Sequence, residues 1–210
     1  MRTTPPLAPA PPSAVDPDRP DLTPAARRVL DTASRLFYER GIHAVGVDLI
    51  AAEAGVTKKT LYDRFGSKEQ IVVDYLLTRD ARWRAFLAAH HDPAALTPVE
   101  RVLAVFDASK EWSRGENAGK GCGMVKAHAE IGDPSHPAYA VITGQKQWTL
   151  DLFTRLAHDV APDAARELGR SLTLLHEGAL VTDGLDVFPD PFGRARRLAA
   201  FLLSAARDPR

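Results

Sequence analysis

Residues 47–69 read VDLIAAEAGVTKKTLYDRFGSKE, and this stretch decides the fold. Its first part is a short amphipathic segment that ends at Gly55, a residue type that commonly follows the last turn of a helix. Thr57 then supplies a capping hydroxyl for a second segment that begins with two lysines. The stretch therefore predicts two short helices, at 47–54 and 58–65, that are joined by a tight turn.

Helix-start signals of the same kind recur along the chain. Thr23-Pro24, Thr97-Pro98 and Asp190-Pro191 each place a capping residue before a proline. Apolar residues follow at helical spacing, and no stretch shows the sustained period-2 alternation of a strand. The sequence predicts an all-α fold with helices at 24–40, 47–54, 58–65, 68–89, 98–114, 124–131, 137–160, 163–185 and 191–206.

The composition fits a packed chain without an overall charge bias. Of the 210 residues, 45% are hydrophobic, and 27 acidic residues balance 27 basic ones. A surface for nucleic acid must therefore be a local patch. No apolar run approaches the roughly 20 residues that span a bilayer, and the N-terminus does not resemble a secretory signal. We expect no membrane partner and a cytoplasmic location.

Catalytic and metal-binding patterns are not evident. The single cysteine, Cys122, excludes an intrachain disulfide and a multi-cysteine metal site. The seven histidines show no ligand spacing; His128 and Glu130, for example, are two residues apart and do not share a helix face. We expect no metal, no cofactor and no enzymatic activity.

A longer pattern surrounds the tight turn. It runs Ile50-Ala-x-x-Ala-Gly-Val-Thr-x-x-Thr-Leu-Tyr-x-x-Phe-x-Ser-Lys-Glu69 and resembles the N-terminal domain of the TetR/AcrR family of bacterial transcriptional regulators. One branch of that family is also similar in the C-terminal part, at Gly121-Cys-Gly-Met, Ala127-x-x-Glu130, His136-Pro137 and His176-Glu-Gly-Ala-Leu180. The resemblance implies a three-helix head with a helix-turn-helix at about 46–65 and a larger helical body.

The resemblance also implies the domain organisation and the partners. Residues 1–21, which are rich in proline, are expected to form a disordered arm. Residues 22–83 would form the DNA-binding domain, and residues 84–210 the effector-binding and dimerisation domain. The expected partners are double-stranded DNA with a palindromic operator, a small-molecule effector and a second copy of the chain.

The second helix of the helix-turn-helix carries the expected DNA contacts. Hydroxyl groups and lysines suit phosphates and base edges in the major groove. Asp63 and Arg64 are expected to pair on the surface instead, and Gly46 replaces a hydroxyl residue that relatives use at the start of the preceding helix. The predicted DNA-binding residues are Thr57, Lys58, Lys59, Thr60, Tyr62 and Lys68.

Two further sets of candidates lie in the body. Aromatic and polar residues that suit a largely apolar effector pocket are Trp112, Cys122, Met124, His128, Trp148, Phe153 and His176. Residues of the last two helices that suit a dimer contact are Leu172, Leu175, Gly178, Ala179, Thr182, Leu198, Ala199 and Leu202.

The resemblance implies a homodimeric transcriptional repressor that a small-molecule effector releases from its operator, and two other functions stay open at this level. Cys122 is the basis of a thiol-based, redox-sensing regulator with no small-molecule effector, provided that its environment activates the thiol. An all-helical ligand carrier or enzyme with a vestigial DNA-binding head is the third hypothesis.

Overall fold

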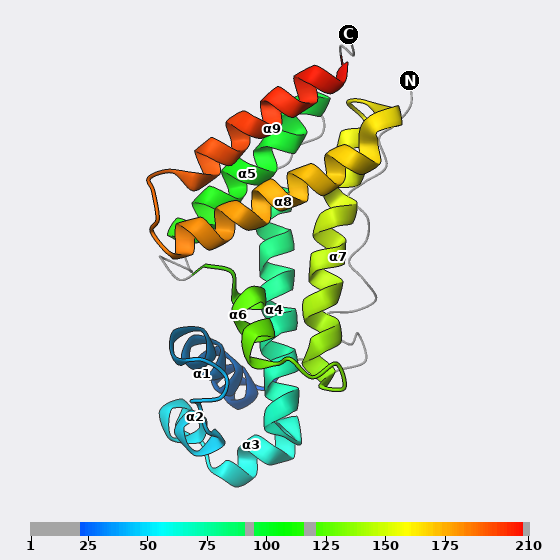
Figure 1. Cartoon of the computed structure of the whole chain (residues 1–210). Helices are drawn as coiled ribbons and strands as arrows, with labels where there is room; N and C mark the ends of the chain where they lie inside the picture. The colour runs from blue at the N-terminus through cyan, green and yellow to red at the C-terminus, as the bar shows by residue number, and fades with distance from the viewer. Residues whose placement is uncertain (1–21, 91–94, 116–120, 208–210) are drawn as a thin grey trace. The chain divides into compact units, whose positions relative to one another are not determined.

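The computed structural model describes residues 22–90, 95–115 and 121–207, so the arm predicted at 1–21 lies outside the described residues. Within these ranges the chain is all-α, as predicted, and no helix is both long and apolar enough to cross a membrane (Figure 1). The described helices are α1 (Pro24–Arg40), α2 (Val47–Ala54), α3 (Lys58–Phe65), α4 (Lys68–Ala89), α5 (Pro98–Arg114), α6 (Gly123–Glu130), α7 (Pro137–His158), α8 (Ala165–Gly184) and α9 (Pro191–Arg207).

The first five helices have the predicted bounds, and the last four differ by a few residues. The helix predicted at 137–160 ends at His158, and the one predicted at 163–185 begins only at Ala165. Between them, Pro162–Ala164 forms a single 3₁₀ turn. Proline has a fixed φ and no N–H, so it suits the first position of such a turn.

Side-chain caps mark the starts of α1 and α5. The Thr23 hydroxyl accepts the N–H of Ala26 at 3.3 Å, and α1 follows with proline in its first turn. Thr97 and Glu100 form a reciprocal capping box at the start of α5. The threonine-proline signals of the sequence are therefore confirmed as helix starts.

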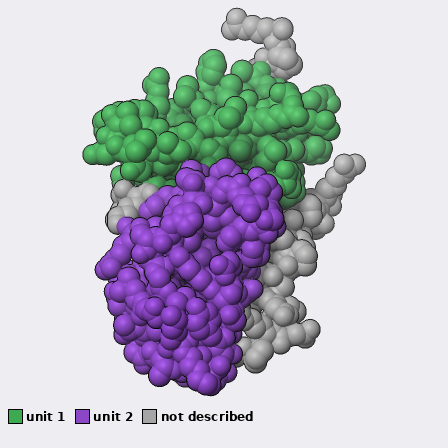
Figure 2. Space-filling view, turned by 60° about the horizontal axis from the view of Figure 1, so that its bottom comes forward, with its two compact units in different colours: residues 1–9, 83–122, 146–210 green, residues 10–82, 123–145 purple. Residues whose placement is uncertain are grey.

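The described residues fall into two compact units (Figure 2). We call residues 22–82 with 123–145 the head unit, and the described residues of 83–122 with 146–207 the body unit. The sequence predicts a domain boundary between residues 83 and 84, with 123–145 in the C-terminal domain. In the structure this segment belongs to the head unit instead, because side chains of α6 bind the end of α1.

Apolar side chains from α1 to α4 form the core of the head unit. The most deeply buried of them include Leu36, Ile50, Leu61, Ile71 and Leu76. The turn between α2 and α3 is formed by Gly55, whose φ of 65° is left-handed and whose N–H reaches back to the last turn of α2. The short α2 and α3 depend on this shared core, because isolated helices of such length are not stable in water.

The body unit has a larger apolar core. Within it α9 packs against both α5 and α8, and the core is dominated by Phe106, Phe153, Leu172 and Phe192. Helix α8 approaches α7 closely at Gly169. A Cβ atom at this position would lie 2.2 Å from Thr154 Oγ1 and 2.8 Å from Thr154 Cα.

Gly169→Ala should therefore destabilise the protein by about 1–3 kcal/mol, since the backbone of α7 leaves no room for a methyl group. Gly144→Ala is the matched control, because Gly144 lies inside α7 and a Cβ atom there would have no other atom within 4 Å. That variant should be neutral or up to about 1 kcal/mol more stable. Urea denaturation measures both, and equal effects would contradict the close approach of the two helices.

Candidate nucleic-acid interface

Helix α3 has one buried face and one exposed face. Leu61 and Phe65 are buried in the head core, whereas Lys58, Lys59 and Tyr62 are exposed. The Tyr62 side chain is one of the large apolar groups on the surface, since the residue is 40% exposed. The core therefore fixes the rotation of α3 and leaves its basic residues accessible.

The other predicted contact residues lie at the two ends of α3 or on its edge. Thr57 caps α3, because its hydroxyl accepts the N–H of Thr60 at 3.1 Å. Thr60 is half-buried, and its hydroxyl lies 2.9 Å from that of Thr57. Lys68, in the first turn of α4, is also half-buried. All six predicted residues thus belong to one continuous segment with access to solvent.

Both lysines of α3 are paired with carboxylates. Lys58 Nζ lies 3.0 Å from Asp48 Oδ1, and the hydrogen bond and charge of Asp48 raise the pKa of Lys58. Lys59 Nζ lies 2.9 Å from Asp63 Oδ2, so Asp63 binds Lys59 rather than the expected Arg64. Exposed ion pairs contribute little net stability. A phosphate can therefore replace either carboxylate at low cost.

Helix α2 is held to α1 by charged side chains rather than by its own cap. Gly46 makes no side-chain capping hydrogen bond, as expected from its lack of a hydroxyl. Arg35 forms an ion pair with Glu53, and Arg40 Nη2 lies 3.8 Å from the same carboxylate. These pairs join the outer surfaces of the two helices.

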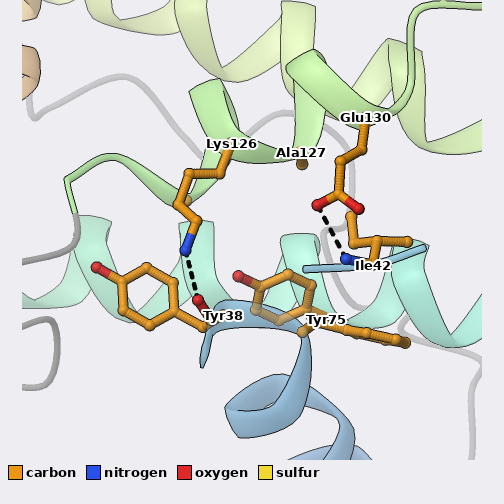
Figure 3. Close-up of a pocket in the computed structure, with 8 residues that line it drawn as sticks. Tyr38, Ile42, Tyr75, Lys126, Ala127 and Glu130 are labelled. Atoms are coloured by element: carbon orange, nitrogen blue, oxygen red, sulfur yellow. Dashed lines mark hydrogen bonds between the residues drawn. The ribbon is translucent and has the colours of Figure 1, made fainter. Parts of the chain in front are cut away.

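A small cleft in the head unit separates the end of α1 from α6 (Figure 3). Lys126 and Glu130 reach across it from α6, toward Tyr38 and Ile42. None of the predicted effector residues lines this cleft. The sequence motif Ala127-x-x-Glu130 includes one of the two residues, and Lys126 lies four residues before Glu130 and so shares its face of α6.

The predicted effector residues are distributed over several environments. In the body unit, the Phe153 ring lies 5.6 Å from the His176 ring, and Trp112 contacts the rings of Trp83 and Phe86. Trp148 is also in the body unit, beneath the guanidinium of Arg84. Met124 and His128 lie in the head unit. The structure therefore joins only part of the predicted set.

A polar network that the sequence did not reveal surrounds His176. Lys146 Nζ donates to Glu177 Oε2 at 2.7 Å and to Cys122 Sγ at 3.4 Å. The Ser109 hydroxyl lies 2.8 Å from His176 Nε2 and donates its proton to the carbonyl of Val105, so it accepts from His176. Within the described residues, no group of three or more His, Cys, Asp or Glu side chains could hold a metal ion.

Two atoms of this network are buried without a hydrogen-bond partner, His176 Nδ1 and Glu177 Oε1, and they lie 3.7 Å apart. Burial by itself raises the pKa of Glu177, but the neighbouring His176 side chain and the charge of Lys146 outweigh it and lower the pKa to about 2. Burial likewise lowers the pKa of Lys146, but Cys122 and Glu177 outweigh it and raise that pKa. Lys146 and Glu177 are therefore both charged at neutral pH.

The predicted dimer residues need correction in part. Leu172, Ala179 and Ala199 are buried within the chain, because α8 and α9 use this face to pack on each other. Leu175, Thr182 and Leu202 are half-buried or lie at the edge of this face, whereas Gly178 and Leu198 are more accessible. The most exposed apolar residues of the two helices were not in the predicted set; they are Leu174, Val181 and Phe201, with Leu185 directly after α8.

Comparisons with known proteins give a consistent result. The family model described as "Bacterial regulatory proteins, tetR family" matches residues 29–75. The chain is 32% identical to a TetR-family transcriptional regulator from Streptomyces coelicolor, SCO4454, and the superposition covers 88% of this chain and 96% of that one with a TM-score of 0.80. This similarity extends through both units and not only through the helix-turn-helix.

Curated relatives match over shorter stretches. The chain is 37% identical to the HTH-type transcriptional repressor KstR2 of Mycolicibacterium smegmatis over 101 residues, 45% of this chain and 46% of the repressor. It is 45% identical to the HTH-type transcriptional activator FasR of the same organism over 49 residues, 23% of this chain and 22% of the activator. The chain thus spans less than half the length of these curated relatives.

The polar network predicts a specific pH dependence. The folded-state pKa of Glu177 lies below its ordinary value of 4.5, so its contribution to stability is present above that pH and is lost as the pH falls toward 2. Glu177→Gln should cost about 1–3 kcal/mol at neutral pH and should flatten the acid limb of the stability profile.

Urea midpoints between pH 7 and about 2.5 measure this effect. Glu167→Gln is the control, because Glu167 forms an exposed pair with Arg170 in the same helix. If the stability of wild type and that of Glu177→Gln fall equally with decreasing pH, the Glu177 carboxylate is not stabilised by His176 and Lys146.

Proposed function

The chain belongs to the TetR family of bacterial regulatory proteins, and we propose that it is a homodimeric transcriptional repressor that binds a palindromic operator and is released by a small-molecule effector. One observation carries the proposal. The core fixes α3 through Leu61 and Phe65, and the opposite face of α3 exposes Lys58, Lys59 and Tyr62. This is the geometry of a helix that enters the major groove.

The contacts divide by chemistry. Thr57 and the free N–H groups of the first turn of α3 bind a phosphate, and Lys58 and Lys59 exchange their carboxylate partners for phosphates or a guanine edge. Tyr62 forms a hydrogen bond to the DNA backbone through its hydroxyl group, and Lys68 binds the flanking DNA backbone. The two heads of a dimer then read half-sites about one helical turn, roughly 34–36 Å, apart.

The dimer is proposed to form through an apolar stripe on α8 and α9. Leu174, Gly178 and Val181 recur at helical spacing on the exposed side of α8, with Leu185 directly after it, and Leu198 and Phe201 are exposed on α9. Leu174, Leu185 and Phe201 are 75%, 70% and 71% exposed in the single chain. Monomeric proteins rarely leave such a contiguous apolar surface uncovered.

We place recognition of the effector at the polar network of the body unit. His176 Nδ1 and Glu177 Oε1 lack hydrogen-bond partners although they are buried, and a ligand that carries an N–H or O–H group beside an apolar body would satisfy them. Such a ligand would release DNA if it binds the arrangement that does not fit the operator more tightly.

Repression rather than activation is favoured by the longer of the two curated matches, which is to a repressor.

The ion pair of Lys146 with Glu177 does not favour the redox hypothesis, since Lys146 already has a carboxylate partner beside Cys122. A regulator of this kind acts in the cytoplasm, where its operator is.

Selection of bound fragments from genomic DNA of the source organism, followed by footprinting, tests the function. A recovered palindrome, protected on both half-sites, would support it and name the regulated genes. A folded dimer that enriches no sequence at moderate salt would refute it.

Tyr62→Ala and Lys58→Ala should each lower operator affinity by more than about 100-fold, because both remove contacts that also position α3 in the groove. Lys58→Ala should also reduce the slope of log K against log salt by about 1. Arg64→Ala is the matched control on the exposed surface of α3 and should change affinity little. Fluorescence anisotropy with the selected operator measures all three, and wild-type affinity in both test variants would overturn the assignment.

Phe201→Glu should convert the protein to a monomer, since a charge would be buried without a partner in the proposed interface. Sedimentation equilibrium gives the oligomeric state. Val125→Glu is the control, because Val125 is an exposed apolar residue of the head unit. A Phe201→Glu protein that remains a dimer would place the interface elsewhere.

A further inference from the structure

The carboxylate of Glu130 binds the backbone that follows α1. Its Oε1 accepts the N–H of Ile42 at 2.9 Å, and its Oε2 accepts the N–H of His43 at 2.7 Å. The bonds join residues that are 88 and 87 positions apart in the chain. Figure 3 shows Glu130 pointing from the end of α6 toward Ile42.

Lys126 makes a second attachment one helical turn earlier on α6. Its Nζ donates to the carbonyl of Tyr38 at 2.5 Å and lies 4.6 Å from the centre of the Tyr38 ring. The guanidinium of Arg79, from α4, also lies 4.5 Å from the same ring centre. The Lys126 ammonium group therefore binds a carbonyl group in the last turn of α1. The Glu130 carboxylate binds two N–H groups directly after that helix.

The connection between α1 and α2 is anchored by the buried side chains of Ile42 and Val45, and Glu130 binds its backbone. The chain turns at Gly41, whose φ of 88° is left-handed, and a Cβ atom there would lie 3.0 Å from Glu130 Oε1. The N-terminus of α2 has no side-chain cap. Glu130 thus adds to the head core and to the Arg35–Glu53 ion pair in fixing the position of α2, and through it that of α3.

We propose that Glu130 and Lys126 are positioning residues for DNA binding, and that operator affinity depends on the attachment of α6 to the end of α1. This inference rests on the proposed function. With both attachments made, the helix-turn-helix is ordered before it meets DNA, and less conformational freedom is lost on binding. When α6 is detached, the backbone of residues 41–46 gains conformational freedom. The head then makes fewer phosphate contacts simultaneously.

Glu130→Gln tests the proposal, because an amide has the same shape but only one oxygen to accept the two N–H groups. Hydrogen exchange of the Ile42 and His43 amides should become faster. Operator affinity should fall by about tenfold or more, as expected for loss of hydrogen bonds to a charged acceptor. The slope of log K against log salt should also decrease, which a purely structural role would not cause, since that slope counts phosphate contacts made by folded protein.

Glu100→Gln is the matched control. The Glu100 carboxylate also accepts two hydrogen bonds, from the N–H and hydroxyl of Thr97 at 2.8 and 2.6 Å, but in the body unit. This variant should keep the wild-type affinity and salt slope. Lys126→Met, which keeps the apolar stem beside Tyr38 but lacks the donor, should act in the same direction as Glu130→Gln.

The outcomes separate the inference from the function on which it rests. Faster amide exchange in Glu130→Gln with unchanged or higher operator affinity overturns the positioning role. Equal losses of affinity in Glu130→Gln and Glu100→Gln also overturn it, since the effect would then be one of general stability. Wild-type protein without sequence-specific binding refutes the proposed function itself.

Discussion

The backbone at the end of α1 depends on an acceptor that lies far away in the sequence. Backbone N–H groups that lie outside a helix or sheet need an acceptor of their own, and here the N–H groups of Ile42 and His43, directly after α1, donate to the carboxylate of Glu130. Together with Lys126, this side chain joins residues 123–145 to the N-terminal helices of the head unit. It also explains the glycine at position 41, where a side chain would meet that carboxylate.

The proposed DNA surface is local, as a chain with no net charge requires. Its two lysines on α3 are each paired with an aspartate, one from α2 and one from α3 itself. Such exposed pairs are screened by salt and are easily exchanged for phosphates. The carboxylates therefore reduce the positive field of the free head while they leave the lysines available to DNA.

The body unit combines an apolar core with one polar network. Lys146 and Glu177 form a half-buried ion pair, and His176 beside it is 4% exposed and contacts Phe106 and Phe153. Burial of such groups is costly unless their hydrogen bonds are satisfied, and two atoms here have no partner. Trp148 Nε1 in the same unit also lacks a partner, so it is the charged Lys146–Glu177 pair beside the two atoms that distinguishes this place from the rest of the core. The outer faces of α8 and α9 differ from both the core and the polar network, because their apolar residues are exposed.

The sequence by itself determined the all-α fold, the bounds of the first five helices and the segment that carries the DNA-contact candidates. Caps, prolines and helical spacing are local signals, so they can be detected without knowledge of any long-range contact. The helix-turn-helix is likewise one continuous segment. Its pattern also identified the family, which the similarity over both units confirmed.

Only the tertiary structure decided what depends on contacts between distant segments. It paired Lys58 with Asp48, joined Glu130 to the end of α1, and brought Lys146 to Glu177 and Cys122. It also showed which face of α8 and α9 is consumed within the chain, so that Leu172, Ala179 and Ala199 are core and Phe201 is exposed. Helical spacing shows which residues share a face, but which partner covers that face is a property of the packed chain.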